Sequence, residues 1–355
     1  MKTFIEVFGL FMVAFSLLPM IRTTNRWVRM LDFPRIQIAL FLSVSLIIYL
    51  IFWSSSQPFS TIWIGALVLA LLIQARMIFR FTPFSRVEAI RSKAKVHSDA
   101  FSMMVSNVRM ENEHKQPFIK LVRENNPDLL LVNEPDQRWA EQLKVLDKVY
   151  PYSVQNPLGN TYGMMLFSKL PLVHSQVLYR VEQGIPSIHT QVELPSGERF
   201  DLYAVHPQPP THSNDTEKRE AELLMVGREV KKTGRASIVA GDLNDVGWSI
   251  STNLFKKISG MLDPRIGRGF YNTYNVFVPF FRYPLDHVFY SPQFQLIEMK
   301  RLPAFGSDHF PILIRLCYAP EKKYKQPVEP ATQEEKEEAI ELIQEGLKSE
   351  AKKGN

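Results

Sequence analysis

Six short stretches of this sequence place polar side chains directly at the ends of apolar, strand-like runs. Four of them follow such a run and two begin or precede one, and the last contains an adjacent Asp-His pair. Polar groups at the edges of buried strands converge at one rim of a sheet, where sites are often built. We therefore expect these side chains to meet. They are Asn107, Glu134, His206, Asp242, Asn244, Asp286, Asp308 and His309.

The residue types in this set fit the hydrolysis of a phosphodiester assisted by a divalent cation. Mg²⁺ and Mn²⁺ prefer hard oxygen ligands, usually one or two carboxylates completed by water and substrate phosphate. The single cysteine, Cys317, excludes a disulfide within the chain and a cysteine-based zinc site. Suitable oxygens are offered by Glu134, Asp242, Asp308, Asn107 and Asn244.

Attack on phosphorus also requires a water molecule that loses a proton. His309 can accept that proton, and the carboxylate of Asp286 can hold its imidazole in the right tautomer. His206 can bind a phosphoryl oxygen or protonate the leaving group. A turn or a helix cap explains any one of these residues equally well, so it is their combination that indicates a hydrolytic site.

Short β-like runs alternate with helical ones from about residue 100 onward, which predicts an α/β or α+β layered sandwich. The predicted strands cover residues 101–108, 129–133, 163–167, 188–194, 200–205, 237–240, 287–290 and 311–316. The predicted helices cover residues 115–124, 137–147, 216–231 and 249–257. Residues 195–198 are typical of a hairpin turn. Residues 319–355 form a charged tail, in which Thr332 and Glu335 make a capping box that predicts a short, peripheral helix.

The motifs around these residues occur in the order found in one superfamily. The sequence resembles the endonuclease/exonuclease/phosphatase superfamily, which includes pancreatic-type deoxyribonucleases, apurinic endonucleases, neutral sphingomyelinases and inositol-polyphosphate phosphatases. The resemblance covers about residues 99–318, and the segments 267–274 and 284–286 most resemble a membrane-anchored bacterial branch. The most specific motifs are Asn126-Pro-Asp-Leu-Leu-Leu-Val-Asn-Glu134, Gly241-Asp-Leu-Asn-Asp245, Pro284-Leu-Asp-His-Val-Phe289 and Gly306-Ser-Asp-His-Phe-Pro311.

The resemblance implies an α/β (α+β) four-layer sandwich, with two packed β-sheets flanked by helices and the site at one end. It implies that Glu134 is the principal metal ligand, aided by Asn107 and Asp308. Asp242 and Asn244 would orient the nucleophilic water and the phosphate. Asp286 and His309 would form a base dyad, or an electrostatic clamp on the phosphate, and His206 would contact the scissile phosphate. The sequence departs mildly from the family at Asn133, where many members have Gln.

The front of the chain is apolar. Residues 36–53 and 59–75 carry no charge, and a run of about 18 helical residues reaches roughly 27 Å, close to the thickness of a bilayer core. A third run, residues 4–21, is interrupted by Glu6; a signal peptide is its alternative interpretation. We expect a bundle of two or three transmembrane helices within residues 1–82, spanning about 4–21, 36–53 and 59–79. The alternative is a buried helical hairpin of a soluble protein.

Charge is unevenly distributed. Residues 1–96 contain 11 Lys/Arg and 3 Asp/Glu, whereas residues 97–320 contain 24 of each. Basic residues lie between the first two apolar runs and in a linker at 83–98, so the positive-inside rule predicts a multi-pass protein with a cytoplasmic catalytic domain. The resemblance to a bacterial branch implies a bacterial inner membrane. A periplasmic or external domain is the alternative. The neutral domain also weakens the expectation of a nucleic-acid groove.

These patterns predict a membrane-anchored, Mg²⁺- or Mn²⁺-dependent phosphodiesterase. Nuclease-like activity is slightly favoured by the breadth of the family, and a phospholipid or phosphoinositide phosphodiesterase or phosphatase is the alternative. A non-enzymatic alternative is a catalytically idle membrane scaffold with the same fold. The aromatic residues between 270 and 283 fit a stacking platform for bases, a lip that dips into lipid, or a small core under their loop. The oligomeric state and the choice between endo- and exonucleolytic action are left open.

Overall fold

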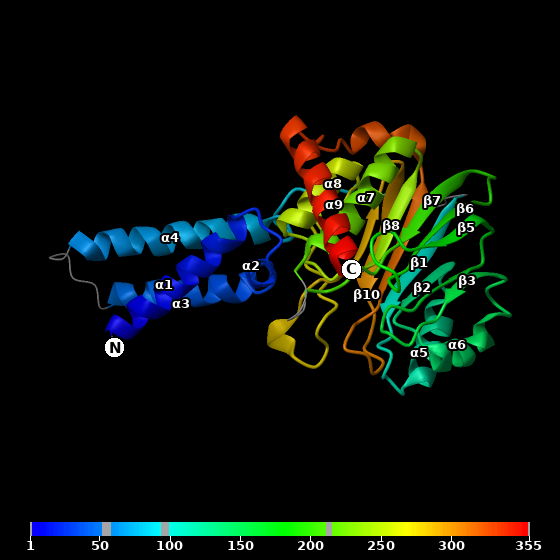
Figure 1. Cartoon of the computed structure of the whole chain (residues 1–355), viewed down its shortest axis with the longest axis horizontal. Coiled ribbons are helices and arrows are strands. Elements are labelled where there is room, and N and C mark those ends of the chain that lie inside the picture. The colour runs from blue at the N-terminus through cyan, green and yellow to red at the C-terminus, as the bar shows by residue number, and fades with distance from the viewer. Residues whose placement is uncertain (1, 52–57, 94–98, 211–214, 354–355) are drawn as a thin grey trace.

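The computed structural model describes residues 2–51, 58–93, 99–210 and 215–353. It consists of an elongated helical bundle that projects from one side of a strand-rich domain (Figure 1). The bundle is built from α1 (Lys2–Leu17), α3 (Arg35–Ile51) and α4 (Pro58–Phe79). The short helices η1 (Leu18–Met20) and α2 (Arg26–Met30) lie where it meets the domain. Most of the segment that separates the uncharged runs 36–53 and 59–75 lies outside the described residues.

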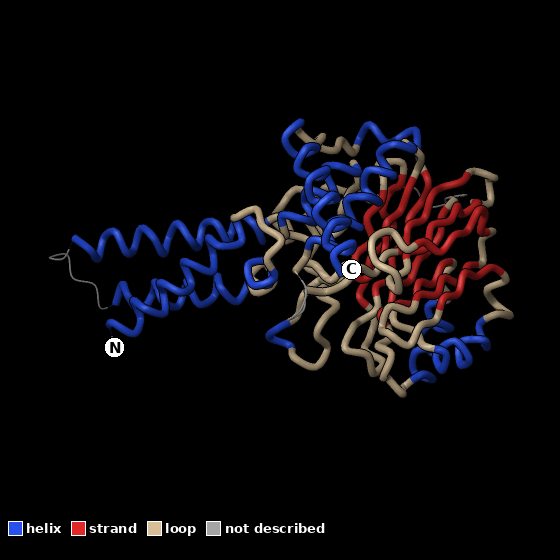
Figure 2. The backbone as a smooth tube through the Cα atoms, viewed as in Figure 1, coloured by secondary structure: helices blue, strands red, loops and turns tan. Residues whose placement is uncertain are grey.

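Two β-sheets pack face to face in the domain (Figure 2). The first has the strand order β10-β11-β1-β2-β4-β3 and the second β5-β6-β7-β8-β9. The first sheet contains β1 (Ala100–Asn107), β2 (Leu129–Asn133), β3 (Tyr152–Asn156), β4 (Met164–Ser168), β10 (Phe294–Arg301) and β11 (Ile312–Tyr318). The second contains β5 (Leu172–Leu178), β6 (Ser187–Glu193), β7 (Arg199–Ala204), β8 (Ser237–Asp242) and β9 (Asp286–Tyr290).

The alternation of side chains along each strand divides the apolar residues between two cores. In β1, Met103 and Val105 belong to the core between the sheets, whereas Met104 faces outward into a second core. Stacked aromatic rings join the sheets, with the centroids of Phe101 and Phe200 5.0 Å apart. Burial of these large rings stabilises the domain and holds its strand ends in fixed positions.

Helices cover the outer face of each sheet. The first sheet is covered by α5 (Lys115–Asn125) and α6 (Gln137–Leu143), which continues as η2 (Lys144–Leu146), and the second by α7 (Glu217–Thr233) and α8 (Ile250–Ser259). The predicted arrangement of two packed sheets flanked by helices is therefore confirmed. All eight predicted strands and all four predicted domain helices are present, with shifts of a few residues at their ends.

The C-terminal helix differs from its prediction. Thr332 and Glu335 form the predicted capping box, each backbone N–H donating to the other side chain. The helix that follows, α9 (Gln333–Lys353), has 21 residues and packs against α7 and α8. Ala339 and Ile343 are buried there. The expectation of a short, peripheral helix was wrong, because an amphipathic pattern does not reveal which surface its apolar face will cover.

The bundle is fixed to the domain by buried contacts. The Trp248 indole Nε1 donates to the carbonyl of Asp32 at 2.7 Å, and its ring lies 5.5 Å from that of Phe81. The predicted basic linker is also docked, since Glu88 accepts two hydrogen bonds from Lys256. Among the described helices, Ser60–Phe79 is long and apolar enough to cross a bilayer, whereas α1 and α3 are apolar but shorter.

Candidate active site

The strand order brings the ends of six strands to one rim. β1 and β2 run parallel with Asn107 paired to Asn133, so Glu134 emerges beside Asn107. β7 and β8 are also parallel, which places His206 and Asp242 at the carboxyl ends of neighbouring strands. β9 runs the other way and begins at Asp286, and β11 begins just after His309 in the opposite direction to β1. The rim therefore collects residues from positions far apart in the sequence.

Gly241 allows β7 and β8 to approach closely at this rim. Its φ is +144°, and a Cβ built there would lie 1.9 Å from the carbonyl oxygen of Val205. A residue with a side chain would have to push the strands apart. The absence of a Cβ therefore helps to hold Asp242 beside His206.

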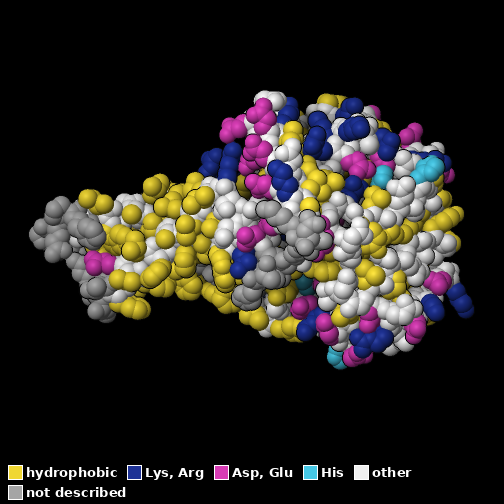
Figure 3. Space-filling view, viewed as in Figure 1, with side chains coloured by type: hydrophobic (Ala, Val, Ile, Leu, Met, Phe, Trp, Pro, Cys, Tyr) yellow, Lys and Arg dark blue, Asp and Glu magenta, His cyan; other side chains and the backbone are white. Residues whose placement is uncertain are grey.

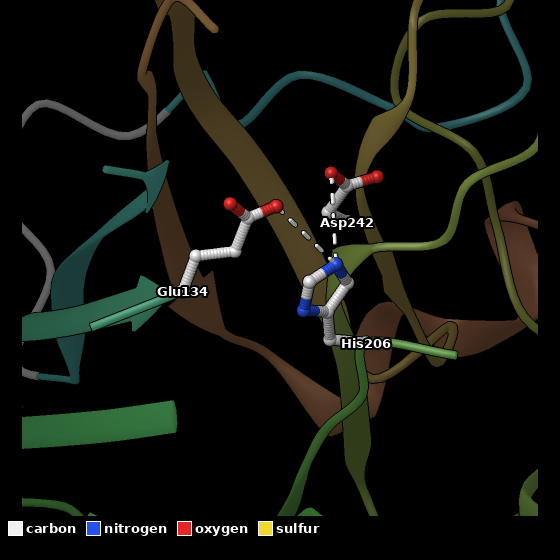
Figure 4. Close-up of side chains that lie close together, drawn as sticks. All are labelled: Glu134, His206 and Asp242. Carbon is white, nitrogen blue, oxygen red and sulfur yellow. Dashed lines mark ion pairs between the residues drawn. The ribbon is translucent and has the colours of Figure 1, made fainter. Parts of the chain in front are cut away.

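The partly buried carboxylate of Glu134 and the buried carboxylate of Asp242 lie together at the centre of the site. The Asn107 amide Nδ2 donates to Glu134 Oε1 at 2.7 Å and to Asp242 Oδ2 at 3.1 Å. His206 Nε2 lies 3.9 Å from the first oxygen and 4.0 Å from the second (Figure 4). Glu134 has a φ of 64°, a conformation that costs energy for a non-glycine residue and occurs often at functional sites.

Burial dominates the electrostatics of this group. It raises the pKa of Glu134 to about 7, and the neighbouring Asp242 carboxylate adds to that rise while the Asn107 hydrogen bond opposes it. Burial lowers the pKa of the His206 imidazole. Burial would raise the pKa of Asp242, but the His309 and His206 rings hold it below its usual range.

His309 and Asp286 form a hydrogen-bonded pair beside the carboxylates. His309 Nδ1 donates to Asp286 Oδ2 at 2.8 Å, and its Nε2 lies 3.6 Å from Asp242 Oδ2. Burial alone would lower the pKa of His309, but the Asp286 and Asp242 carboxylates raise it to about 10. The imidazole can therefore exchange a proton at Nε2, the atom that faces the carboxylates.

Asn244 and Asp308 lie at the margin of the cluster. The Asn244 backbone N–H donates to Asp242 Oδ1 at 3.0 Å, while its side-chain amide donates to the Pro207 carbonyl at 3.0 Å. Asp308 is half-buried, and its charge contributes to the raised pKa of His309. The structure thus gathers Asn107, Glu134, His206, Asp242, Asp286 and His309 closely and places Asn244 and Asp308 next to them.

The sequence and the fold identify the family of the chain. Residues 104–309 match the model of the Endonuclease/Exonuclease/phosphatase family. The chain belongs to this family. A comparison with curated protein sequences found no match.

Solved structures share the fold of this family member at low sequence identity. The human Nocturnin catalytic domain with bound sulfate anion is 17% identical, with 64% of this chain and 96% of that chain covered and a TM-score of 0.53. D. rerio TDP2 complexed with single strand DNA product is 15% identical, with 61% and 98% covered and a TM-score of 0.50. An endonuclease/exonuclease/phosphatase from Beutenbergia cavernae DSM 12333 is 16% identical, with 62% and 72% covered and a TM-score of 0.50. These likenesses establish the fold.

Three residues that support the candidate site were not assigned to it from the sequence. The Ser307 hydroxyl donates to the Asn107 carbonyl at 2.8 Å and accepts from the His309 backbone at 3.1 Å. The Thr273 hydroxyl oxygen accepts the backbone N–H of Asp286 at 3.1 Å, and the Tyr274 ring lies 4.9 Å from the His309 ring. Ser307 stands inside a recognised motif, but nothing in the residue types of Thr273 and Tyr274 indicates their contacts.

A second histidine lies close by in a structural role. His287 Nδ1 accepts from Arg265 at 2.7 Å, and its Nε2 is 2.8 Å from the Asp245 carbonyl. Burial and the nearby Arg265 lower the pKa of His287 to about 3. The ring therefore stays neutral and joins Arg265 to the turn after β8, unlike His309 with its raised pKa.

Proposed function

We propose that this chain is a membrane-anchored, divalent-metal-dependent hydrolase of phosphodiesters. The observation that carries the proposal is the meeting of Asn107, Glu134 and Asp242 with the His309–Asp286 pair at one rim. An idle scaffold has no need of a buried and a partly buried carboxylate held together by one amide, since such a pair costs stability unless a cation joins it. Membership of the family supports the same reaction class.

The residues present fit Mg²⁺ or Mn²⁺. Glu134, His206 and Asp242 each turn one donor atom into a space where these atoms lie within 4.8 Å of one another. We assign Glu134 to the cation, with Asp242 and Asp308 as neighbouring oxygen donors. When bound, the cation would neutralise charge that develops on the phosphoryl oxygens.

Asn107 takes a positioning role in this proposal. The resemblance assigns it to the metal, but its amide oxygen accepts the Arg109 backbone N–H at 2.9 Å, while its nitrogen points at both carboxylates. The amide therefore holds Glu134 and Asp242 at a fixed separation, which reduces the cost of ordering them when the site fills.

Each of the other residues has a separate role in the proposed hydrolysis. Asp242 orients the attacking water, and Asn244 fixes Asp242 through its backbone N–H. His309, oriented by Asp286, exchanges a proton at Nε2 or holds the phosphate by its charge. His206 is buried and has a lowered pKa, so it contacts the phosphate as a neutral ring.

The bundle supports anchoring in a membrane. Its outer surface is apolar, with Phe11, Ile47 and Leu72 each more than half exposed. Figure 3 shows hydrophobic side chains along its length and Lys and Arg side chains where it meets the domain. This distribution fits an apolar bilayer core bounded by headgroups. We propose that the domain faces the cytoplasm.

Hydrolysis of bis(p-nitrophenyl) phosphate by the full-length chain tests the proposed function. We expect turnover with Mg²⁺ or Mn²⁺ that stops when a chelator is added, and a loss of about 10²-fold or more in Asp242→Asn. Asp147→Asn, at an exposed aspartate outside the site, is the matched control and should keep full activity. Absence of metal-dependent turnover against this and other phosphoesters would instead support the scaffold.

A further inference from the structure

One loop connects the active site to the helical bundle. Residues 274–283, here called the rim loop, begin at Tyr274, which forms a β-bridge with His309. The Val276 backbone N–H donates to the Asp308 carbonyl at 2.8 Å. The first part of the rim loop is therefore tied directly to the catalytic rim.

The tip of the rim loop lies against the bundle. The side chain of Gln37, in the first turn of α3, donates to the carbonyl of Phe280, and the rings of Phe41 and Phe280 are 6.4 Å apart. Figure 1 shows the loop with its short helix η3 (Pro279–Phe281) reaching from the domain toward the bundle. The loop therefore occupies the corner between the two parts of the molecule.

The tip of the rim loop is apolar and exposed. Residues 275–281 contain no charge. Phe277, Val278, Phe280 and Phe281 are 57%, 43%, 47% and 46% exposed. Arg282 folds back and donates to the Asn275 and Val276 carbonyls, away from the tip. A cluster of large apolar side chains on a loop marks an interaction surface.

The position of the tip along α3 indicates what covers this surface. Arg35 lies within 3.3 Å of Gln74 near the domain end of α4, which places the edge of the apolar region at that level. Phe41 is one and a half turns further along α3, about 9 Å by the rise of a helix. The exposed face of α3 continues beyond it through Val44 and Ile47. Phe280 thus sits beside the part of the bundle that a bilayer would surround.

Cationic groups stand on the catalytic side of the same loop. The guanidinium groups of Arg282 and Arg301 lie 5.0 and 4.2 Å from the centre of the Phe310 ring, next to His309 in the chain. Partial burial lowers the pKa of Arg301, and the positive charge of the nearby Arg282 lowers it further. The apolar tip lies against the bundle, whereas the two arginines lie against Phe310 next to the rim. This order, from the bundle to the rim, matches that of acyl chains and phosphates at a bilayer surface.

We infer that the rim loop inserts into the bilayer that holds the bundle and that the site hydrolyses the phosphodiester of a membrane lipid. This inference rests on the proposed function and names its substrate class. The oxygen of water forms a bond to phosphorus, and the bond from phosphorus to one ester oxygen breaks. The proton that water loses ends on the departing oxygen, so the products are an alcohol and a phosphomonoester. The arginines bind the lipid phosphate while the loop keeps the rim at headgroup depth.

Depth measurements on the full-length chain in phosphatidylcholine nanodiscs test the docking without using activity. An environment-sensitive fluorophore is attached to Phe281→Cys in a Cys317→Ser background. The matched control is Val145→Cys, equally exposed at 44% and following α6 on the side remote from the bundle. We expect lipids with a quencher in the acyl chain to quench the probe at 281 and leave the probe at 145 unchanged. Equal quenching, or none at 281, would overturn the docking.

Turnover measurements test the substrate class. The full-length chain in nanodiscs of phosphatidylcholine and phosphatidylglycerol should release lipid products, and the double variant Phe277→Ser/Phe281→Ser should release them about tenfold more slowly. The variant should hydrolyse soluble bis(p-nitrophenyl) phosphate at the normal rate, as should the control Val145→Ser/Val149→Ser on both substrates.

The outcomes separate this inference from the proposed function. Unchanged lipid turnover in the loop variant, or an equal loss on both substrates, would overturn the role of the loop. Cleavage of bis(p-nitrophenyl) phosphate and single-stranded DNA without cleavage of lipid would overturn the lipid substrate and leave the proposed function standing. If the chain cleaves none of these phosphodiesters, both the proposed function and the lipid substrate are contradicted.

Discussion

Asn107 in the first sheet donates a 3.1 Å hydrogen bond to Asp242 in the second, 135 positions away in the sequence. The same amide nitrogen reaches Glu134, so one side chain links the two sheets at the catalytic rim. Removal of this side chain would leave the Glu134 and Asp242 carboxylates without their common donor. The geometry of the site therefore depends on this amide as well as on the carboxylates.

Asn107→Ala should lower kcat/KM for bis(p-nitrophenyl) phosphate by about 10- to 100-fold and weaken the apparent affinity for Mn²⁺ by a similar factor. The reason is that Glu134 and Asp242 lose the donor that fixes their separation. Steady-state kinetics over a range of Mn²⁺ concentrations measure both effects. Asn156, the last residue of β3, donates a 3.4 Å hydrogen bond to the Tyr179 hydroxyl, and Asn156→Ala is the control that should leave both values unchanged. A variant with normal Mn²⁺ affinity would contradict the positioning role.

Asp286→Asn should move the pH dependence that His309 gives to kcat/KM toward lower pH. The Asp286 carboxylate stabilises the charged imidazole and helps to raise the pKa of His309 to about 10, so a neutral amide at this position lowers that pKa. If His309 accepts a proton, the rate rises with pH through this pKa; if it acts as a charged clamp, the rate falls. In either case the pH at which the rate changes is lower in the variant. An unchanged pH dependence would contradict the assignment of Asp286 as the group that raises the pKa of His309.

Glu222→Gln should stabilise the protein at alkaline pH. Glu222 is buried in α7, and burial raises its pKa to about 8, against the opposing charge of Arg180. Between the unfolded pKa of about 4.5 and this value the folded state binds more protons, so stability falls as pH rises, by roughly 5 kcal/mol. The variant should therefore have a higher apparent Tm than the wild type at pH 8, with a smaller difference at pH 5. Glu124→Gln, at an exposed site, should show neither effect.

Gly346→Val should loosen α9 from the domain. A Cβ at Gly346 would lie 2.4 Å from the Ala221 Cβ, so the larger side chain separates α9 from α7 at a cost of about 1–3 kcal/mol. Differential scanning fluorimetry should show a lower apparent Tm. Gly65→Ala is the control, because a Cβ there would meet no atom within 4 Å. An unchanged Tm would show that α9 does not stabilise the domain.

Local sequence patterns predicted most of the sandwich because buried strands have a recognisable apolar pattern in the sequence. The strands of the cores are continuous apolar runs, as in β2, β4 and β8, all of whose residues are buried. β3 and β5 were missed because they lie at sheet edges and most of their side chains are at least partly exposed, which removes the apolar signal. β10 was missed as well, and a bulge at Leu296/Glu298 interrupts its alternation.

The residues of the candidate site were predicted more completely than the neighbouring residues that hold them in place. Polar residues that could do chemistry are visible in the sequence at the ends of apolar runs, and the topology brings these strand ends to one rim. The hydroxyl of Thr273 and the ring of Tyr274 act through contacts across the fold, and their residue types carry no such signal. The docking of the bundle, through Trp248 and Asp32, is likewise a long-range contact. The aromatic segment was left with three interpretations because only the fold shows that Phe280 lies beside Phe41.

The central claim is that Glu134 holds the cation needed to hydrolyse a phosphodiester, and the Mn²⁺ dependence of bis(p-nitrophenyl) phosphate hydrolysis tests it most directly. Burial raises the pKa of Glu134 to about 7, so protons compete with the cation and the Mn²⁺ requirement of the full-length chain should increase as pH falls below that value. Glu134→Gln should lower kcat/KM by about 10²-fold or more and remove this pH dependence, whereas Glu124→Gln should match the wild type. A Glu134→Gln variant with the same rate and the same Mn²⁺ dependence as the wild type would contradict the account.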